Sequence, residues 1–299
     1  MNSVKNARRF TDTIASLRWF DLRRERLHDG KEQRSVAGMK ASDALETRPH
    51  ALPAILGAVV LLGIALIPFV MPLGTVENPG PEFYMKERER MVARDVAARG
   101  VTNALVLQAM GRVPREEFVL PQYRRFAYQD GALPIDAQQT ISQPYMVAAM
   151  TEALDPQPED VVLEVGTGSG YQAAILAGVV RHVYSVEIIE SLARSAETTL
   201  TRMGYTNITL RTGDGYQGWP DHAPYDAIIV TAAPEHVPQP LVDQLKPGGK
   251  MVIPVGERWH TQVLKVLEKV ADGSMRTNEL MDVRFVPMTG DPTEIAVGD

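Results

Sequence analysis

Strand and helix signals alternate along the chain from residue 160 onward. Five short apolar runs have the length of buried strands, and the stretches between them have the spacing of helices. The apolar runs are 161–165, 183–188, 207–211, 226–231 and 250–255, and the helical stretches lie near 171–179, 190–203 and 238–245. This alternation predicts an α/β fold, with a Rossmann-like, doubly wound and mostly parallel sheet that helices cover on both faces.

The two ends of this region carry different signals. Runs 262–270 and 279–288 have no clear helix between them, so we expect an antiparallel pair at one edge of the sheet. Upstream, Glu82 to Ala98 is helical by composition and is closed by Gly100, and a helix over Asn103 to Met110 follows Thr102 as a cap. Pro114 suits the first turn of a further helix. The sequence therefore predicts an N-terminal helical subdomain before the sheet.

A glycine-rich turn follows the first strand of the sheet. Residues 162–171 read VLEVGTGSGY, a buried strand, a turn with Gly166 and Gly168, and the start of a helix. A dinucleotide-binding turn would place its third glycine where Tyr171 stands. Glu164 precedes the turn, where a carboxylate would repel a pyrophosphate and attract the ammonium group of S-adenosylmethionine. The turn thus favours S-adenosylmethionine over NAD as cofactor.

Acidic residues also follow the next two strands. Glu187 ends the second strand, where a carboxylate can accept hydrogen bonds from both hydroxyls of a ribose. Asp214 and Gly215 follow the third strand, where the acid could bind the exocyclic amine of adenine and the glycine leaves room for the ring. Each signal is weak alone, but three acids at three successive strand ends predict one ligand crevice.

Composition and a short motif narrow the choice of methyl acceptor. The chain has no cysteine, which excludes a cysteine nucleophile and hence pyrimidine C5 methylation. Residues 51–299 hold 20 Lys and Arg against 30 Asp and Glu, so they lack the basic surface of a duplex-DNA binder. The segment VTAAP at 230–234 also lacks the Asp or Asn, Pro-Pro, aromatic sequence usual in enzymes that methylate base amino groups. We therefore expect no nucleic-acid partner, and the scattered histidines predict no metal site.

Seven segments together resemble one enzyme family. They are TISQPYM (140–146), VLEVGTGSGY (162–171), GDG (213–215), YDAIIVTAAP (225–234), LKPGG (245–249), PVG (254–256) and RFVPMTG (284–290). In order and spacing they resemble protein-L-isoaspartate O-methyltransferases, over roughly residues 90–290. The resemblance implies the class I methyltransferase fold and transfer of a methyl group from S-adenosylmethionine to the free α-carboxylate of an L-isoaspartyl residue. The ester then closes to a succinimide, whose hydrolysis returns some normal aspartate.

The resemblance also implies site residues. It places Ser142 at the active site, Thr140 and Ile141 against cofactor and substrate, and Thr289 over the site. Read alone, Ser142 would be an ordinary loop serine. A carboxylate acceptor is ionised at neutral pH, so the reaction needs positioning of the two partners and no general base.

The N-terminal part of the chain lies outside this resemblance. Residues 51–73 contain no charge, and 23 residues of helix are long enough to span a bilayer. We therefore expect a basic tail (1–50), a transmembrane helix (51–73), a linker (74–81) and a catalytic domain (82–299). Within that domain, 82–159 would form the helical and substrate-loop part and 160–299 the cofactor-binding sheet. Three basic residues flank each end of the apolar segment, so the charges do not decide its orientation.

Three questions stay open at the level of sequence. The first question is localisation. The cofactor is supplied in the cytoplasm, which favours a cytoplasmic catalytic domain tethered to the membrane through 51–73. A single helix behind a basic tail, however, more often places its C-terminal domain in the periplasm. The expected partners are isoaspartyl proteins and peptides, but a relative that methylates aspartate in a dedicated peptide, or a tethered binding module without turnover, would share this fold. The oligomeric state is not encoded in any motif.

Overall fold

The computed structural model describes residues 79–290, all within one compact unit. The predicted basic tail, the predicted transmembrane helix 51–73 and most of the predicted linker lie outside the described residues. Across residues 79–290, no helix combines the length and the apolar character needed to cross a membrane.

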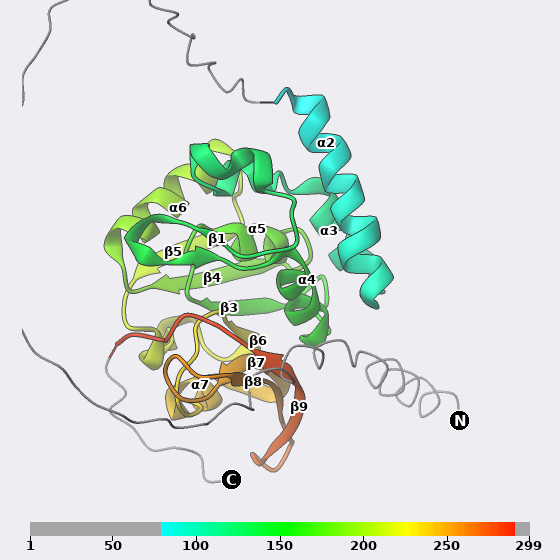
Figure 1. The fold of residues 1–299 in the computed structure, drawn as a ribbon. Helices are drawn as coiled ribbons and strands as arrows, with labels where there is room; N and C mark the ends of the chain where they lie inside the picture. The colour runs from blue at the N-terminus through cyan, green and yellow to red at the C-terminus, as the bar shows by residue number, and fades with distance from the viewer. Residues whose placement is uncertain (1–78, 291–299) are drawn as a thin grey trace, which may run out of the picture. The chain divides into compact units, whose positions relative to one another are not determined.

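Helices form the first part of the unit (Figure 1). The main helices before the sheet are α2 (Pro81–Arg90), α3 (Ala104–Arg112) and α4 (Pro144–Ala153). Short 3-10 helices occupy Arg115–Phe118, Pro121–Phe126 and Asp136–Gln138, and β1 (Leu133–Pro134) pairs with β2 (Thr140–Ile141). α2 continues through a π turn (Met91–Val96) and a 3-10 turn (Ala97–Arg99) to Gly100, whose φ of 101° ends the helix. This confirms the predicted helix and its glycine stop.

The cap of α3 differs from the prediction. Asn103, not Thr102, is the N-cap, because the Asn103 side chain accepts hydrogen bonds from the backbone N–H groups of Leu105 and Val106 at 2.9 and 3.3 Å. The backbone N–H of Thr102 instead donates to the Glu152 carboxylate at 2.6 Å. Pro114 likewise precedes its 3-10 helix as the N-cap and does not occupy the first turn.

A seven-stranded sheet forms the rest of the unit, in the order β5-β4-β3-β6-β7-β8-β9. Its strands are β3 (Val161–Val165), β4 (His182–Glu187), β5 (Ile208–Thr212), β6 (Tyr225–Val230), β7 (Leu245–Val255), β8 (Gln262–Lys269) and β9 (Met275–Val283). The connecting helices are α5 (Tyr171–Ala177), α6 (Glu190–Arg202) and α7 (Gln239–Asp243). Strands β3 to β7 pair in parallel, and β8 and β9 are antiparallel additions at one edge. The predicted doubly wound sheet with an antiparallel edge is confirmed.

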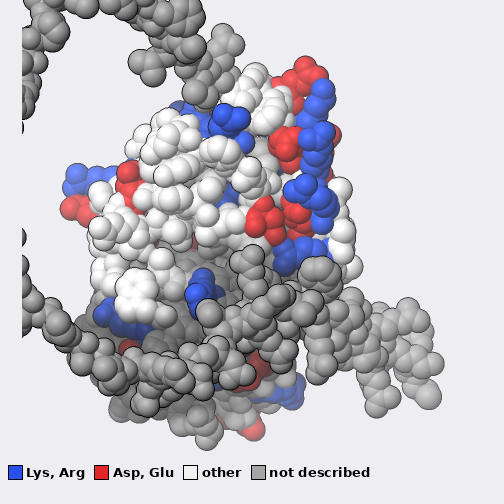
Figure 2. Space-filling view, viewed as in Figure 1, with Lys and Arg blue, Asp and Glu red and all other residues white. Residues whose placement is uncertain are grey.

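Both faces of the sheet are covered, each by its own apolar cluster. Successive strand residues point to opposite faces, so Val162 joins the cluster with Ile175 of α5, whereas Leu163 joins the cluster with Leu241 of α7. Helices α2 to α6 contribute to the first cluster. The helical part and the sheet therefore share one core, which fixes the loop before α4 relative to the strand ends. On the face seen in Figure 2, acidic and basic side chains are interspersed along α2, where Lys86 pairs with Glu82 at 2.8 Å.

The last predicted strand, 279–288, is wrong in its bounds. β9 ends at Val283, and the chain then turns back across the sheet as the red segment of Figure 1. There the Ala233 N–H donates to the Val286 carbonyl at 2.9 Å, and the Met288 N–H donates to the Ala233 carbonyl at 2.8 Å. Residues 286–288 thus form a short parallel bridge with Ala233 and do not extend β9.

Candidate functional site

A pocket opens at the carboxyl ends of β3, β4 and β6. It encloses about 800 Å³ of space, part of it continuous with solvent. Four kinds of segment line it: the loop through β2, the loops after the strands, the turn after β5 and the segment after β9. The main lining residues are 139–142, 165–169, 186–189, Gly215, 231–232 and 286–289. Parallel α/β sheets bind ligands at this edge, so the position alone makes it the candidate site.

The glycine-rich turn forms the floor of the pocket. Gly166 and Gly168 have φ values of 97° and 53°, which side-chain-bearing residues rarely adopt. A Cβ atom on Gly166 would lie 2.5 Å from the Thr231 hydroxyl oxygen, which itself donates to the Gly166 carbonyl at 2.6 Å. A side chain at Gly166 would therefore collide with Thr231, and the turn lines the pocket with its backbone.

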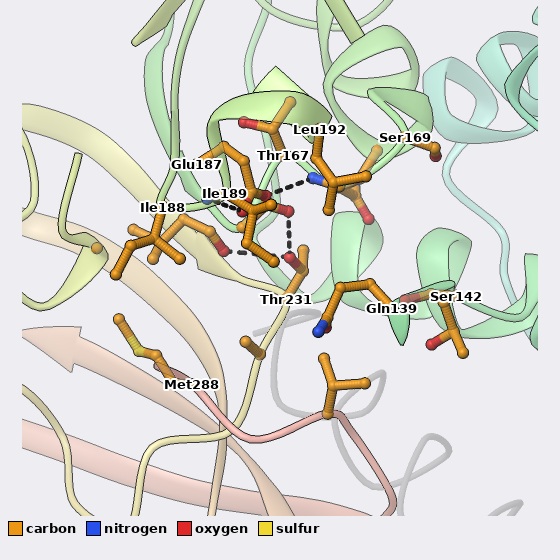
Figure 3. A pocket seen from close by; sticks show the side chains of 18 of the residues that line it. Gln139, Ser142, Thr167, Ser169, Glu187, Ile188, Ile189, Leu192, Thr231 and Met288 are labelled. Atoms are coloured by element: carbon orange, nitrogen blue, oxygen red, sulfur yellow. Dashed lines mark hydrogen bonds between the residues drawn. The ribbon is translucent and has the colours of Figure 1, made fainter. Parts of the chain in front are cut away.

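Glu187 ends β4 beside this turn, as predicted, and lines the pocket. One carboxylate oxygen accepts the Gly168 N–H at 2.8 Å and the other accepts the Ile189 N–H at 2.9 Å. Figure 3 shows the Glu187 side chain lying across the turn toward the pocket. A carboxylate can accept about four hydrogen bonds, so both oxygens retain capacity for a ligand.

Glu164 occupies a different place from the one predicted. It is fully buried beneath the turn and does not line the pocket. Ser185 donates to one carboxyl oxygen, the hydroxyls of Ser185 and Thr167 lie 2.6 Å apart, and the other Glu164 oxygen has no partner among the described residues. Burial raises the pKa of Glu164 to about 8, against the opposing effect of the Ser185 hydrogen bond.

The role predicted for Glu164 therefore needs correction. At neutral pH a group with this pKa is mostly protonated, so it does not present the negative charge on which the sequence argument relied. Its contacts support the turn through Ser185 and Thr167.

Of the predicted pair Asp214 and Gly215, only Gly215 lines the pocket. Gly215 lines the pocket, and a Cβ atom there would lie 2.5 Å from a methyl carbon of Val165, so only glycine fits. Asp214 is not among the lining residues: its side chain caps the turn Gly215–Gln217 by accepting the Tyr216 N–H at 2.9 Å. The structure thus gives Asp214 a part in shaping the turn.

The remaining predicted residues gather on the opposite side of the pocket. Thr140, Ile141, Ser142 and Thr289 all line it. Figure 3 shows Ser142 next to Gln139 and across the pocket from Ile188 and Met288. The Ser142 carbonyl accepts a hydrogen bond from Arg115 at 2.7 Å, whereas its hydroxyl has no hydrogen-bond partner among the described residues. That hydroxyl is available to a bound molecule.

Sequence reasoning missed several lining residues. Ile188 and Ile189 directly follow Glu187, and Thr231 directly follows β6. The sequence analysis considered only acidic residues at the ends of strands. These three residues stand at the same strand ends, but their side chains are apolar or carry a hydroxyl. Ile188 is 38% exposed, so the pocket presents an apolar surface beside the carboxylate. Within residues 79–290, no cluster of side chains suits a metal ion.

Comparisons with known proteins agree with this geometry. The profile of the family described as "Protein-L-isoaspartate(D-aspartate) O-methyltransferase (PCMT)" matches residues 86–293. Protein-L-isoaspartate O-methyltransferase 2 of Syntrophobacter fumaroxidans is 58% identical over 227 residues, which cover 73% of this chain and 90% of that protein. The Gloeobacter violaceus protein-L-isoaspartate O-methyltransferase is 52% identical over 199 residues, 67% of this chain and 97% of its own length.

A solved structure extends the comparison to three dimensions. A Plasmodium falciparum protein that bears the same family name, solved in complex with S-adenosyl-L-homocysteine, superimposes with a TM-score of 0.57 at 25% identity. The match covers 69% of this chain and 98% of that one. The family profile and these relatives show that the chain belongs to the protein-L-isoaspartate (D-aspartate) O-methyltransferase family.

Proposed function

We propose that the chain methylates the free α-carboxylate of L-isoaspartyl residues in damaged proteins and peptides, with S-adenosylmethionine as the methyl donor. The observation that carries the proposal is the meeting of two unlike walls in one pocket. One wall is the glycine turn with Glu187, and the other is the loop with Ser142, whose hydroxyl has no hydrogen-bond partner within residues 79–290. A nucleoside and a small polar acceptor need these two surfaces side by side.

The first wall fits the nucleoside part of the cofactor. The Glu187 oxygens are fixed by two backbone N–H groups and keep lone pairs for the ribose hydroxyls. Gly215 lies against Val165 without space for a side chain, and the adenine ring would lie between Gly215 and Ile188. Gly166 and Gly168 would bring the backbone close to the amino-acid part. When bound, S-adenosylmethionine supplies an electrophilic methyl group.

The second wall fits the acceptor. An α-carboxylate is ionised above a pKa of about 3.5, so it needs no base to become a nucleophile. The Ser142 hydroxyl would donate a hydrogen bond to one carboxylate oxygen and hold the other toward the cofactor. Thr140 and Ile141 would contact both partners, and Thr289, on the segment after β9, would cover the site. Positioning of this kind can lower the barrier by roughly 7–11 kcal/mol.

The test is methyl transfer from labelled S-adenosylmethionine by the full chain. The acceptors are two synthetic peptides of one sequence, one with L-isoaspartate and one with L-aspartate. We expect base-labile label on the isoaspartyl peptide alone. Label on the aspartyl peptide would favour the alternative of a dedicated aspartyl substrate. Label on neither peptide, from protein that binds S-adenosylhomocysteine, would refute the proposed activity.

Substitution of Ser142 tests the acceptor wall. We expect Ser142→Ala to lower kcat/KM for the isoaspartyl peptide roughly 10-fold or more, because one hydrogen bond to a charged group contributes about 1.5–3 kcal/mol. Its Kd for S-adenosylhomocysteine should stay unchanged. Ser195→Ala, on the exposed side of α6, is the matched control. Wild-type turnover by Ser142→Ala would remove Ser142 from the mechanism.

We further infer that residues 51–73 tether the domain to a membrane, with the catalytic pocket in the cytoplasm. The supports are the uncharged 23-residue sequence and the supply of S-adenosylmethionine inside the cell. The full chain should then sediment with membranes and resist alkaline extraction, and deletion of 51–73 should release it. Full-length protein in the soluble fraction would contradict the tether.

A further inference from the structure

Arg115 is the largest side chain that is completely buried in the described part of the chain. It opens the 3-10 helix Arg115–Phe118, and its guanidinium joins two separate segments. Nε donates to the Ala127 carbonyl and Nη2 donates to the Ser142 carbonyl, each at 2.7 Å. The same group lies over the Tyr171 ring, 4.7 Å from its centre. The Arg115 side chain thus contacts both the loop that carries Ser142 and Tyr171, the first residue of α5, which directly follows the glycine turn.

Burial of this charge is unfavourable by itself. No carboxylate among the described residues forms an ion pair with Arg115, and its Nη1 has no hydrogen-bond partner there. Burial lowers the pKa of Arg115 to about 10, although the nearby tyrosines act in the opposite direction. A buried charge without an ion-pair partner costs free energy, which the two hydrogen bonds to carbonyls and the contact with the Tyr171 ring offset. Burial of the charge therefore depends on these particular contacts being kept.

The geometry of the guanidinium suits all of these contacts at once. Its planar fork can donate to two carbonyls in fixed directions while its face lies on an aromatic ring, and a lysine ammonium cannot do both. The carbonyl it holds belongs to Ser142, the residue whose hydroxyl faces the pocket. A fixed carbonyl fixes the peptide plane, and with it the direction of the serine side chain.

Asp130 holds the other end of the same loop. Its carboxylate accepts hydrogen bonds from the Gln143 side chain at 2.6 Å and from the Tyr145 N–H at 3.2 Å. Arg99 pairs with Asp130 at 2.5 Å and lies over the Tyr145 ring. The Ser142 loop is therefore held at two points: buried Arg115 binds the Ser142 carbonyl, and Asp130 binds Gln143 and Tyr145 at the start of α4.

We propose that Arg115 is a positioning residue for the acceptor, which acts by holding the Ser142 peptide in the orientation that binds the α-carboxylate. Asp130 supports the same loop from its other end. The inference rests on the proposed function, because it assigns the acceptor to the Ser142 wall. It separates the two walls: loss of Arg115 should weaken acceptor binding and leave the nucleoside wall around Glu187 intact.

The experiment compares Arg115→Lys and Arg115→Met in the full chain with wild type. A misplaced serine should raise KM for the isoaspartyl peptide roughly 10- to 100-fold, while Kd for S-adenosylhomocysteine stays within about 3-fold. Val106→Ala, a cavity in the same apolar cluster but away from the pocket, controls for lost stability. It should lower the unfolding temperature without changing the ratio of KM to Kd.

Two further measurements keep the inference testable. If the Arg115 variants do not fold, Asp130→Asn should raise the same KM by a smaller factor. Hydrogen exchange of residues 140–146 should speed up in Arg115→Lys while that of β4 does not, and this readout is independent of turnover. Inactive wild-type protein would refute the proposed function alone. Wild-type KM in Arg115→Lys, equal shifts of KM and Kd, or unchanged exchange in 140–146 would refute the role of Arg115.

Discussion

The buried carboxyl of Glu164 makes stability depend on pH in a direction that can be measured. Burial raises its pKa from an ordinary 4.5 to about 8, so between these values the folded chain holds a proton that the unfolded chain has lost. The contribution of this proton to stability is complete below the lower value and is lost as the pH rises through the higher one. We therefore expect Glu164→Gln, which stays uncharged and can still accept from Ser185, to lose this dependence.

The magnitude follows from the two pKa values. With one proton bound only in the folded state, the unfolding free energy falls by about 2 kcal/mol between about pH 6 and about pH 8. For a unit of this size that corresponds to a fall of roughly 4–8 °C in the unfolding temperature. The variant should lack this part of the fall, so the two curves should converge toward low pH and separate toward high pH, with the variant more stable.

The assay is thermal unfolding of the full chain and the variant at several pH values in one buffer system. His182, whose pKa burial lowers, is present in both proteins, so its titration cancels in the difference. Glu197→Gln, on the exposed face of α6, is the matched control and should follow wild type. Equal slopes for wild type and Glu164→Gln would mean that Glu164 is ionised in the folded protein, and the account of its buried, protonated state would be refuted.

Two further predictions concern the pocket and the helix cap. Glu187→Ala should raise Kd for S-adenosylhomocysteine roughly 100-fold or more, because two ribose hydroxyls each lose a charged acceptor contributing about 1.5–3 kcal/mol. Calorimetry checks this, with exposed Glu190→Ala as control, and an unchanged Kd would remove the ribose assignment. Asn103→Ala should lower the unfolding free energy by about 1 kcal/mol in urea, since α3 loses its cap. If Thr102→Ala lowers the unfolding free energy by about 1 kcal/mol and Asn103→Ala does not change it, Thr102 is the cap.

Local pattern was sufficient for most of the architecture. The period of apolar residues placed β3 to β6 and β8 to within one residue, because each of these strands buries a run of apolar side chains. The prediction was less accurate for β7, which begins five residues before the predicted 250, and for β9, which begins at Met275 and ends at Val283. The positions of the glycine turn and of Glu187 could also be predicted from the sequence, because both are defined by their distance along the chain from a strand end. The family resemblance added Ser142, which no spacing rule would have selected.

The errors share a physical cause. Glu164 and Glu187 are both acids at strand ends, yet Glu164 lies beneath the turn with a raised pKa and Glu187 lines the pocket. Glu164 pairs with Ser185 in the sheet, so Glu187, two residues after Ser185, points to the same face but lies one step nearer the carboxyl edge. The difference therefore depends on how far along the strand each acid lies and on what covers it there. The early end of β9 depends in the same way on Ala233, a partner about 50 residues away that binds the segment after the strand.

The sequence by itself thus determined the order of the elements, the edge of the sheet that binds ligand and the class of ligand, because these depend on short-range periodicity and on residue type. Only the tertiary structure decided which side chains reach the pocket and which support it from beneath. Arg115 is the clearest case. Nothing in its neighbourhood along the chain distinguishes it, and its importance comes from two carbonyls, at Ala127 and Ser142, that the fold brings to one guanidinium.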